Sequence, residues 1–482
     1  MEHQNPEEGS CGCCRRDFLG AMGAATGGMA LSYTSLLAAE GGAEAAAPKK
    51  RPATVRGAFL YPPSDTLRVP GAWWSWPGND FDAEGRQKQY MARIREMEKK
   101  LGMRILLDET PLDAPAAVAQ FIDQIKQSPP DGLLLIPFKG GHFAHMNQIL
   151  KEVKIPTVVL SSLGVTHGSI KAYQRPEVYF IQSLDNLDAV EYGMRMIQTA
   201  HTMRQSRLIS LAGSAEPRLA TVPHLGTQVW ALPLERFVEE VGRTPVTDEV
   251  RQLARSYMKN AKKILEPAEP EIITAAKVHF ANKRLLEAEQ GDAIMMDCLR
   301  RGELMPCMSY MTLRDEGIAA GCQNDLNPTL TLMLVQHLFD RPGFLQNYCV
   351  ETEANHYFGS HCTCASKLFG TAQPSEPYLL RDYAHSNDPT CCPQVLWREG
   401  EEVTMALYIS GAAPRMLVYT GEVATCYDMP PVGGCRTNVE ITINEVDDVC
   451  DVTPIHHQII FYGNYGKQLR QFANLYGITV TT

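Results

Sequence analysis

Short apolar runs alternate with helical patterns over the first part of the chain, and this alternation restricts the fold more than any other feature. Residues 84–101 carry apolar side chains at helical spacing and end at Gly102, while residues 133–136 and 157–160 are short apolar runs. Such strands, separated by helices, are typical of a parallel sheet that helices cover on both faces. Residues 54–170 are therefore predicted to form a doubly wound α/β domain.

The same alternation returns in the middle of the chain and changes to a period of two near the C-terminus. Further apolar strands are expected at 177–180, 208–211 and 293–296, which predicts a central α/β domain over 171–340. After Pro374 apolar and polar residues alternate, a pattern typical of antiparallel strands. The expected fold is two doubly wound parallel-sheet (Rossmann-like) domains followed by a mainly antiparallel β domain over 341–482.

The first 47 residues resemble an export signal. Arg15 and Arg16 stand just before a Phe-Leu pair, a weakly apolar run continues to residue 37, and Ala43-Glu44-Ala45 matches the small-residue pattern of a cleavage site. Several glycines make the run too polar for a stable membrane anchor. The pattern predicts recognition by the twin-arginine (Tat) export machinery through the paired arginines, and hence a periplasmic or other extracytoplasmic location.

Charge and cysteine content narrow the functional classes. The formal net charge of −10 over 482 residues gives no general attraction to nucleic acid. Three of the 14 cysteines stand in the signal, and the remaining 11 cannot all pair within one chain because their number is odd. They show no CxxC…CxxC zinc spacing, so buried free thiols are expected. Cys362 and Cys364 leave a thiol or metal redox role as an alternative.

Two adjacent histidines, His456 and His457, interrupt an apolar run near the C-terminus. Neighbouring side chains on a strand point to opposite faces, so one of the two imidazoles is expected to be buried. A lone buried histidine is most often a hydrogen-bonded core residue. Three other stretches also carry polar groups that suit a site: Gly-Cys-Gln-Asn-Asp at 321–325, Phe-Leu-Gln-Asn-Tyr at 344–348 and Gly-Ser-His at 359–361.

Together these stretches resemble the metal-binding blocks of the L-arabinose and L-fucose isomerase superfamily, and they are most similar to those of arabinose isomerases. The segment from His456 through Arg-Gln-Phe-Ala at 470–473 carries the resemblance best, and Met429-Pro430 also has a counterpart. The resemblance covers most of the chain after the signal and is strongest over 293–482. It implies a small sugar ligand, aldose–ketose isomerisation, a site between the central and C-terminal domains, and a homo-oligomer, either a trimer or a hexamer.

The resemblance also implies a divalent metal, Mn²⁺, held by two carboxylates and two imidazoles. The matching positions are His361, His457, Gln323 and Gln346, so both family glutamates are replaced by glutamine. A carboxamide cannot remove the proton alpha to a carbonyl, and it coordinates a hard cation without negative charge. The aspartate that follows the second family glutamate falls on Asn347.

Asp325 and Glu351 are the acids expected to substitute as the base, beside Gln323 and Gln346 at the catalytic positions. His361 and His457 are expected to face a sugar together, with His456 as the structural member of the pair. Two functions remain open. The first is an exported isomerase-like enzyme that acts on a monosaccharide or sugar derivative, and the second is a non-catalytic sugar-binding protein on the same scaffold.

Overall fold

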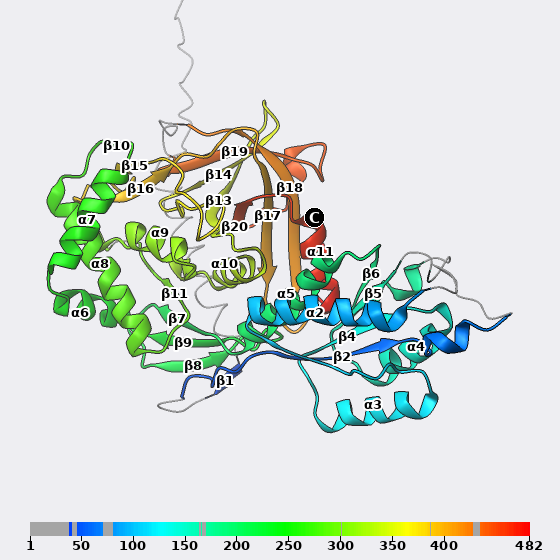
Figure 1. Ribbon diagram of the computed structural model, residues 1–482. Helices are drawn as coiled ribbons and strands as arrows, with labels where there is room; N and C mark the ends of the chain where they lie inside the picture. Colours follow the sequence, from blue (N-terminus) through cyan, green and yellow to red (C-terminus); the bar gives the residue numbers. More distant parts are fainter. Residues whose placement is uncertain are drawn as a thin grey trace, which may run out of the picture.

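The computed structural model describes residues 38–40, 46–70, 81–162, 165, 170–299, 301–385, 387–427 and 434–482. It is a mixed α/β structure with two sheets built mainly of parallel strands, one closed antiparallel sheet and a small three-stranded sheet (Figure 1). Arg15, Arg16, Met429 and Pro430 lie outside the described residues. Within those residues, no helix has both the length and the apolar character needed to cross a membrane.

The N-terminal sheet has five parallel strands with helices on both faces. Its strand order is β3 (Arg104–Leu107), β2 (Thr54–Leu60), β4 (Gly132–Pro137), β5 (Thr157–Ser161) and β6 (Val178–Gln182). One face packs against α2 (Ala83–Leu101) and α5 (Leu187–Arg204), the other against α3 (Pro115–Gln127) and α4 (Phe143–Glu152). The inner strands β4 and β5 are buried throughout because both faces are covered, which explains their continuous apolar runs.

One sequence expectation about this sheet is wrong. The strand at 177–180 was expected to open the central domain, but β6 pairs in parallel with β5 and is the edge strand of the N-terminal sheet. The apolar pattern of a strand does not encode its partner, because the partner depends on where the preceding connection returns the chain. The nearest helix after β6, α5, also packs on this sheet.

The central sheet has the order β1 (Ala38–Glu40), β8 (Arg218–Thr221), β9 (Gln228–Leu232), β7 (Arg207–Leu211), β11 (Ala293–Met296) and β12 (Ala320–Gly321). The four strands from β9 to β12 are parallel, whereas β8 and β1 pair antiparallel at the edge. The helices of this part of the chain are α6 (Glu235–Arg243), α7 (Asp248–Asn260), α8 (Glu269–Ala288), α9 (Cys307–Asp315) and α10 (Leu326–Phe339).

The C-terminal part forms an antiparallel sheet that closes on itself. The order is β17 (Glu402–Ile409), β20 (His457–Tyr462), β13 (Phe344–Glu351), β14 (His356–His361), β19 (Thr437–Ile443) and β18 (Arg415–Thr425), and β18 pairs again with β17. Alternate residues fill the inside, such as Val403, Met405 and Leu407, whereas Ala406 and Tyr408 face outward to α10. This is the period of two read from the sequence.

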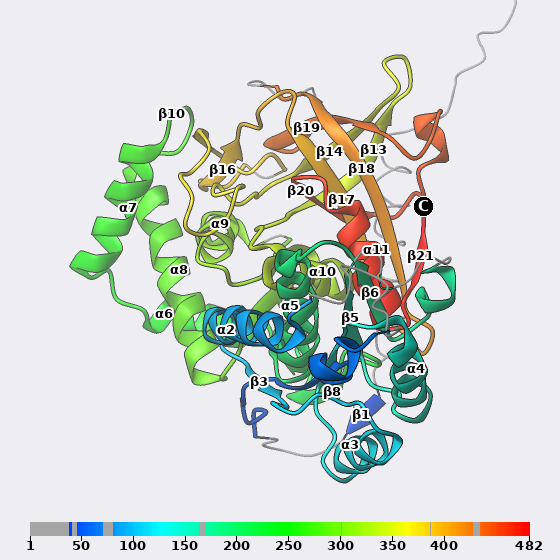
Figure 2. The same cartoon turned by 45° about the vertical axis from the view of Figure 1, so that its right-hand side comes forward.

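Two helices connect the closed sheet to the rest of the molecule. α10 lies between the central sheet and the outer face of the closed sheet, where Thr331 Oγ1 accepts a hydrogen bond from the Tyr408 amide (2.8 Å). α11 (Gly466–Leu475) lies along β18, and β21 (Thr479–Thr481) pairs with the same strand (Figure 2). The Asn474 side chain of α11 donates to the Val178 carbonyl of β6 (3.2 Å). The remaining strands, β10 (Lys263–Ile264), β15 (Tyr378–Arg381) and β16 (Cys392–Val395), form the small sheet.

Candidate functional site

The sequence blocks meet where β13, β14 and β20 lie side by side. Asn347 of β13 is opposite both His457 of β20 and Ser360 of β14 in the strand register. Opposite residues in antiparallel strands have Cα atoms about 5 Å apart and share one face. Asn347 and His457 share the outer face of the closed sheet, the face that packs on α10, because Leu345 and Ile459 of the same parity lie in that core. Three distant segments therefore bring polar groups to one place.

Asp325 and His457 form a hydrogen-bonded pair at the start of α10. Asp325 is the residue before the helix, with an extended backbone, and its Oδ2 accepts a hydrogen bond from His457 Nδ1 at 2.9 Å. His457 is only 1% exposed, and its other ring nitrogen, Nε2, is buried without a hydrogen-bond partner. The carboxylate fixes the proton on Nδ1, so Nε2 presents a lone pair.

His361 lies at the end of β14, with its ring centroid 5.5 Å from that of His457. The Gln323 side-chain amide donates to His361 Nε2 at 3.4 Å, which leaves the proton on Nδ1, a buried atom without a partner. Burial lowers the pKa of His361 to about 3, so the imidazole is neutral near pH 7. This imidazole therefore offers a donor where His457 offers an acceptor.

The Gln323 side chain reaches His361 because the backbone before α10 makes an unusual turn. Gln323 and Asn324 have φ angles of 55° and 53°, in the left-handed region that residues other than glycine seldom adopt. The Asn324 Oδ1 atom accepts a hydrogen bond from Ser210 Oγ (2.9 Å), which holds this turn to β7. Gly321 just before it is packed so closely that a Cβ would meet Thr329 Oγ1 of α10 at 1.8 Å. These contacts thus hold the segment 321–325 in one local conformation.

Gln346 is not brought to these imidazoles. Its side chain is 0% exposed and exchanges hydrogen bonds with the Tyr357 hydroxyl, at 2.8 Å from Nε2 and 3.1 Å to Oε1. Tyr357 belongs to the core inside the closed sheet, so Gln346 points inward while its neighbour Asn347 points outward. Gly359 makes room for it, because a Cβ there would lie 3.1 Å from the Gln346 side chain.

Glu351 is also remote from the site. It lies at the turn between β13 and β14, opposite His356, and its carboxylate accepts hydrogen bonds from the backbone amides of Glu353 and Ala354. Glu351 is four residues beyond Asn347, or about 13 Å along a strand. Of the two acids expected as substitute base, only Asp325 contacts a site imidazole.

The histidine pair divides as the strand pattern predicted, since one imidazole is buried and the other is not. The buried one is His457, and His456 is exposed before β20 begins. The exposed position of His456 therefore disagrees with the structural role expected of it. An exposed side chain outside the strand has no core to support.

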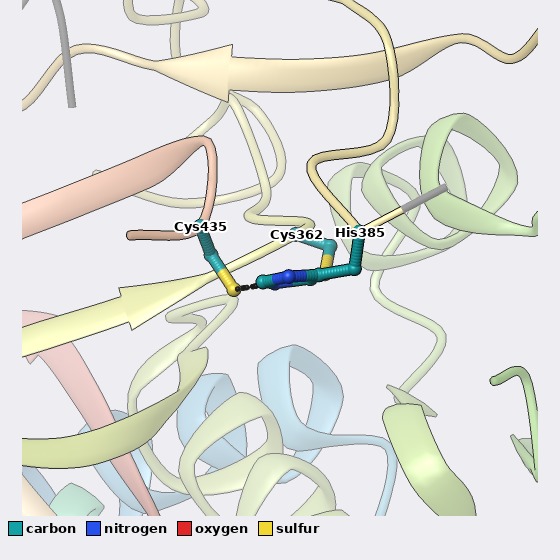
Figure 3. A group of neighbouring side chains, drawn as sticks. All are labelled: Cys362, His385 and Cys435. Atoms are coloured by element: carbon teal, nitrogen blue, oxygen red, sulfur yellow. Dashed lines mark hydrogen bonds between the residues drawn. The ribbon is translucent and has the colours of Figure 1, made fainter. Parts of the chain in front are cut away.

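A second polar cluster adjoins the first and was largely missed from the sequence. Cys362, His385 and Cys435 gather their ligand atoms within 4.8 Å of one another (Figure 3). His385 Nε2 donates to Cys435 Sγ at 3.2 Å, and Cys362 Sγ lies 3.9 Å from Cys435 Sγ. Cys364, which the sequence suggested beside Cys362, is instead buried in the core inside the closed sheet.

Hydrogen bonding makes Cys435 the acidic member of this cluster. The bond from the Cys362 thiol, with a second from His385, lowers the pKa of Cys435 to about 4, although burial acts in the opposite direction. The hydrogen bond between His385 and Cys435 also raises the pKa of His385. His385 and Cys435 stand in loops with no ligand spacing between them, so no sequence signal could have joined them.

The Mn²⁺ ion implied by the sequence resemblance does not fit the residues present. Hard cations prefer several carboxylate oxygens, but among the described residues Asp325 is the one carboxylate found in contact with these imidazoles, and it accepts a hydrogen bond from His457. His361 Nε2 is taken by the Gln323 amide. The polar atoms left over are a mixture of donors and acceptors, whereas a cation requires lone pairs alone.

The chain was compared with models of protein families and with curated proteins, and neither comparison found a match.

Proposed function

We propose that this chain is an exported sugar isomerase-like protein that acts on a monosaccharide or sugar derivative at the site of Asp325, Asn347, His361 and His457. One observation carries the proposal. Three buried polar atoms without partners come from neighbouring strands: His457 Nε2, His361 Nδ1 and Asn347 Oδ1. Buried polar atoms are nearly always hydrogen-bonded in folded proteins, so three such atoms from neighbouring strands can serve to bind a polar ligand.

The kind of ligand follows from the hydrogen-bonding character of these atoms. His457 Nε2 and Asn347 Oδ1 accept, and His361 Nδ1–H donates. Each sugar hydroxyl both donates and accepts, so neighbouring hydroxyls of a monosaccharide would satisfy such a mixed set. The amides carry no charge and the Asp325 carboxylate lies beside His457, which suits an uncharged ligand better than an anion.

The Asp325–His457 pair also suits proton transfer. In an open-chain aldose, His457 Nε2 would accept the proton of C2 as the C2–H bond breaks and the C1=C2 bond of an enediol forms. The proton would then return to C1, while the O2 hydroxyl proton moves to O1, giving the ketose. Asp325 would orient the imidazole and stabilise its cationic form, as a carboxylate does in other carboxylate–imidazole pairs. No oxidant or reductant is needed.

The wider proposal follows the sequence resemblance. The two parallel sheets would be Rossmann-like domains of the sugar isomerase arrangement, and the protein would assemble as a trimer or hexamer. The paired Arg15 and Arg16 support export by the twin-arginine machinery. Replacing both by Lys should retain a fused reporter in the cytoplasm, and equal export of that variant would contradict the assignment.

The decisive experiment is exchange of the C2 proton of L-arabinose and L-fucose with solvent D₂O, followed by NMR. We expect slow exchange with the parent protein and a loss of about a hundredfold in Asp325→Asn, because the imidazole loses the carboxylate that orients it. His457→Gln should lose exchange completely. His456→Gln is the matched control, since His456 is the exposed neighbour.

A second function, non-catalytic sugar binding, is favoured by the amides that stand where the isomerase family has acids. In that case the same NMR titration would show sugar binding without exchange, and His457→Gln but not His456→Gln would weaken it. Neither binding nor exchange with these aldoses, or equal losses in both histidine variants, would contradict a sugar site at His457.

A further inference from the structure

Outside the proposed sugar site, three residues in loops or at strand ends direct their side chains to one point, as metal ligands do. Cys362 follows the last residue of β14, Cys435 precedes β19, and His385 lies between β15 and β16. Figure 3 shows the His385 imidazole edge directed at the Cys435 sulfur, with Cys362 beside it. Both thiols are nearly buried, 7% and 6% exposed, while His385 is exposed and borders solvent.

Two of the three distances between the ligand atoms lie close to those of a tetrahedral zinc site, and all three are below 4.8 Å. With Zn–S bonds of about 2.3 Å and Zn–N bonds of about 2.05 Å, two sulfurs on a tetrahedral ion lie about 3.8 Å apart, and a sulfur and a nitrogen about 3.6 Å. The corresponding distances here are 3.9 Å between the sulfurs and 3.2 Å between His385 Nε2 and Cys435 Sγ. A disulfide would require the sulfurs to approach to about 2.05 Å.

The backbone around the ligands is held by further hydrogen bonds. The Cys435 amide donates to Ser360 Oγ (3.0 Å), which ties the Cys435 loop to β14. The Tyr383 amide donates to Thr390 Oγ1 (2.7 Å), which closes the loop that carries His385. Fixed ligands lose little conformational freedom when a metal binds, and such supporting contacts accompany metal sites.

We propose that Cys362, His385 and Cys435 bind one Zn²⁺ ion. Two thiolates and one imidazole form the sulfur–nitrogen donor set that zinc prefers over the hard cations Mg²⁺ and Mn²⁺. Within the described ranges no fourth His, Cys, Asp or Glu joins this group, so the fourth position is open to water or to a ligand oxygen. Three protein ligands with one open position is the arrangement of catalytic rather than structural zinc.

The zinc site adjoins the proposed sugar site but shares no residue with it. Cys362 directly follows His361, and the Asn347 side-chain amide lies 4.0 Å from Cys435 Sγ. A sugar bound by His361 and Asn347 would thus lie beside the ion. The two proposals are nevertheless separable, because zinc binding requires the thiols and sugar binding the imidazoles of His361 and His457.

Cobalt substitution in the unaltered protein tests the proposal without any variant. The mature chain, reduced and stripped of metal by a chelator, should take up one equivalent of Co²⁺ with thiolate-to-cobalt charge-transfer absorption and the intense visible bands of tetrahedral coordination. Zn²⁺ should displace the cobalt and abolish both. Absence of thiolate charge transfer at one equivalent, or a Cys362–Cys435 disulfide in protein isolated without reductant from zinc-supplemented cells, would overturn the proposal.

Variants then identify the ligands. Cys435→Ser should abolish the charge-transfer band, and His385→Gln should weaken Co²⁺ binding at least tenfold. Cys364→Ser, a buried thiol two residues beyond Cys362, and Cys349→Ser, an exposed thiol, are the controls and should keep the full spectrum. Loss of the band in the controls but not in Cys435→Ser would overturn the assignment.

Discussion

The two faces of β13 treat their polar residues in opposite ways. On the inner face Gln346 and Tyr357 exchange two hydrogen bonds, so that both Gln346 side-chain polar atoms have a partner. On the outer face the next residue, Asn347, and the two imidazoles keep atoms without partners. Asn347 is half-buried as a residue, but its Oδ1 atom and the unpaired ring nitrogens are buried like Gln346, so solvent exposure of these atoms does not explain the difference. Polar atoms that pair within the chain are part of the fold, and those left unpaired are where the molecule can still take up something else.

Gln346→Glu is expected to have the largest effect on stability of the variants that test this difference between the two faces. A carboxylate inside the closed sheet would have no cation beside it, so we expect the free energy of unfolding to fall by about 3 kcal/mol in urea denaturation. Gln323→Glu, at the half-buried site, should cost about 1 kcal/mol or less because solvent and the imidazoles can compensate the charge. Similar small losses in both variants would mean that Gln346 is not confined to the inner face.

The second prediction concerns which acids create a site for Mn²⁺. Gln323→Glu plus Asn347→Asp places both new charges with the imidazoles, whereas Gln323→Glu plus Gln346→Glu places one inside the sheet. We expect the first double variant to bind Mn²⁺ at least about tenfold more tightly than the second, or about 1.4 kcal/mol, by isothermal titration calorimetry. The reverse order would show that Gln346, not Asn347, lies with His361 and His457.

The smallest effect on stability is expected at Glu316, a carboxylate far from the site that already has hydrogen-bond partners. Burial acts to raise the pKa of Glu316, but hydrogen bonds from His279 and Lys283 prevail and lower it to about 2. The unfolded chain therefore binds this proton first as the pH falls from about 4.5 to about 2, and the folded protein loses stability over that window. Because Glu316 is partly exposed, the loss is at most about 1 kcal/mol.

Glu316→Gln tests this by urea denaturation across the same pH window. The variant should be less stable than the parent above about pH 4.5 and should approach it near pH 2. A constant difference at every pH would show that the carboxylate charge is not what stabilises this contact.

The apolar pattern predicted the coarse fold well because a strand buried on one face alternates apolar and polar residues, whereas a strand buried on both faces is apolar throughout. It could not assign β6 to its sheet, since pairing is decided by the path of the connection. In the candidate site, His457 and Asp325 were found from their blocks, and the structure brings them together. The inward direction of Gln346 depends on register within the closed sheet, and sequence similarity alone does not reveal register.

The cluster of Cys362, His385 and Cys435 could not be predicted from the sequence for another reason. Cys362 was visible as a residue, but its partners lie in two loops whose approach is fixed only by the complete sheet. Ligands from separate loops leave no repeated spacing in a sequence. Such sites are recognised only when distances between side chains are known.

The position of β20 has a consequence for how the protein is made. This strand lies between β17 and β13, so Phe344 pairs with Ile460, a residue that is synthesised much later than either of those two strands. Pairing between distant segments is slow, and until it is complete β13 and β17 each expose an unpaired edge to other nascent chains. His457 arrives on that same last strand. A chain that stops before residue 457 is therefore prone to aggregate, and it also lacks the imidazole that contacts Asp325.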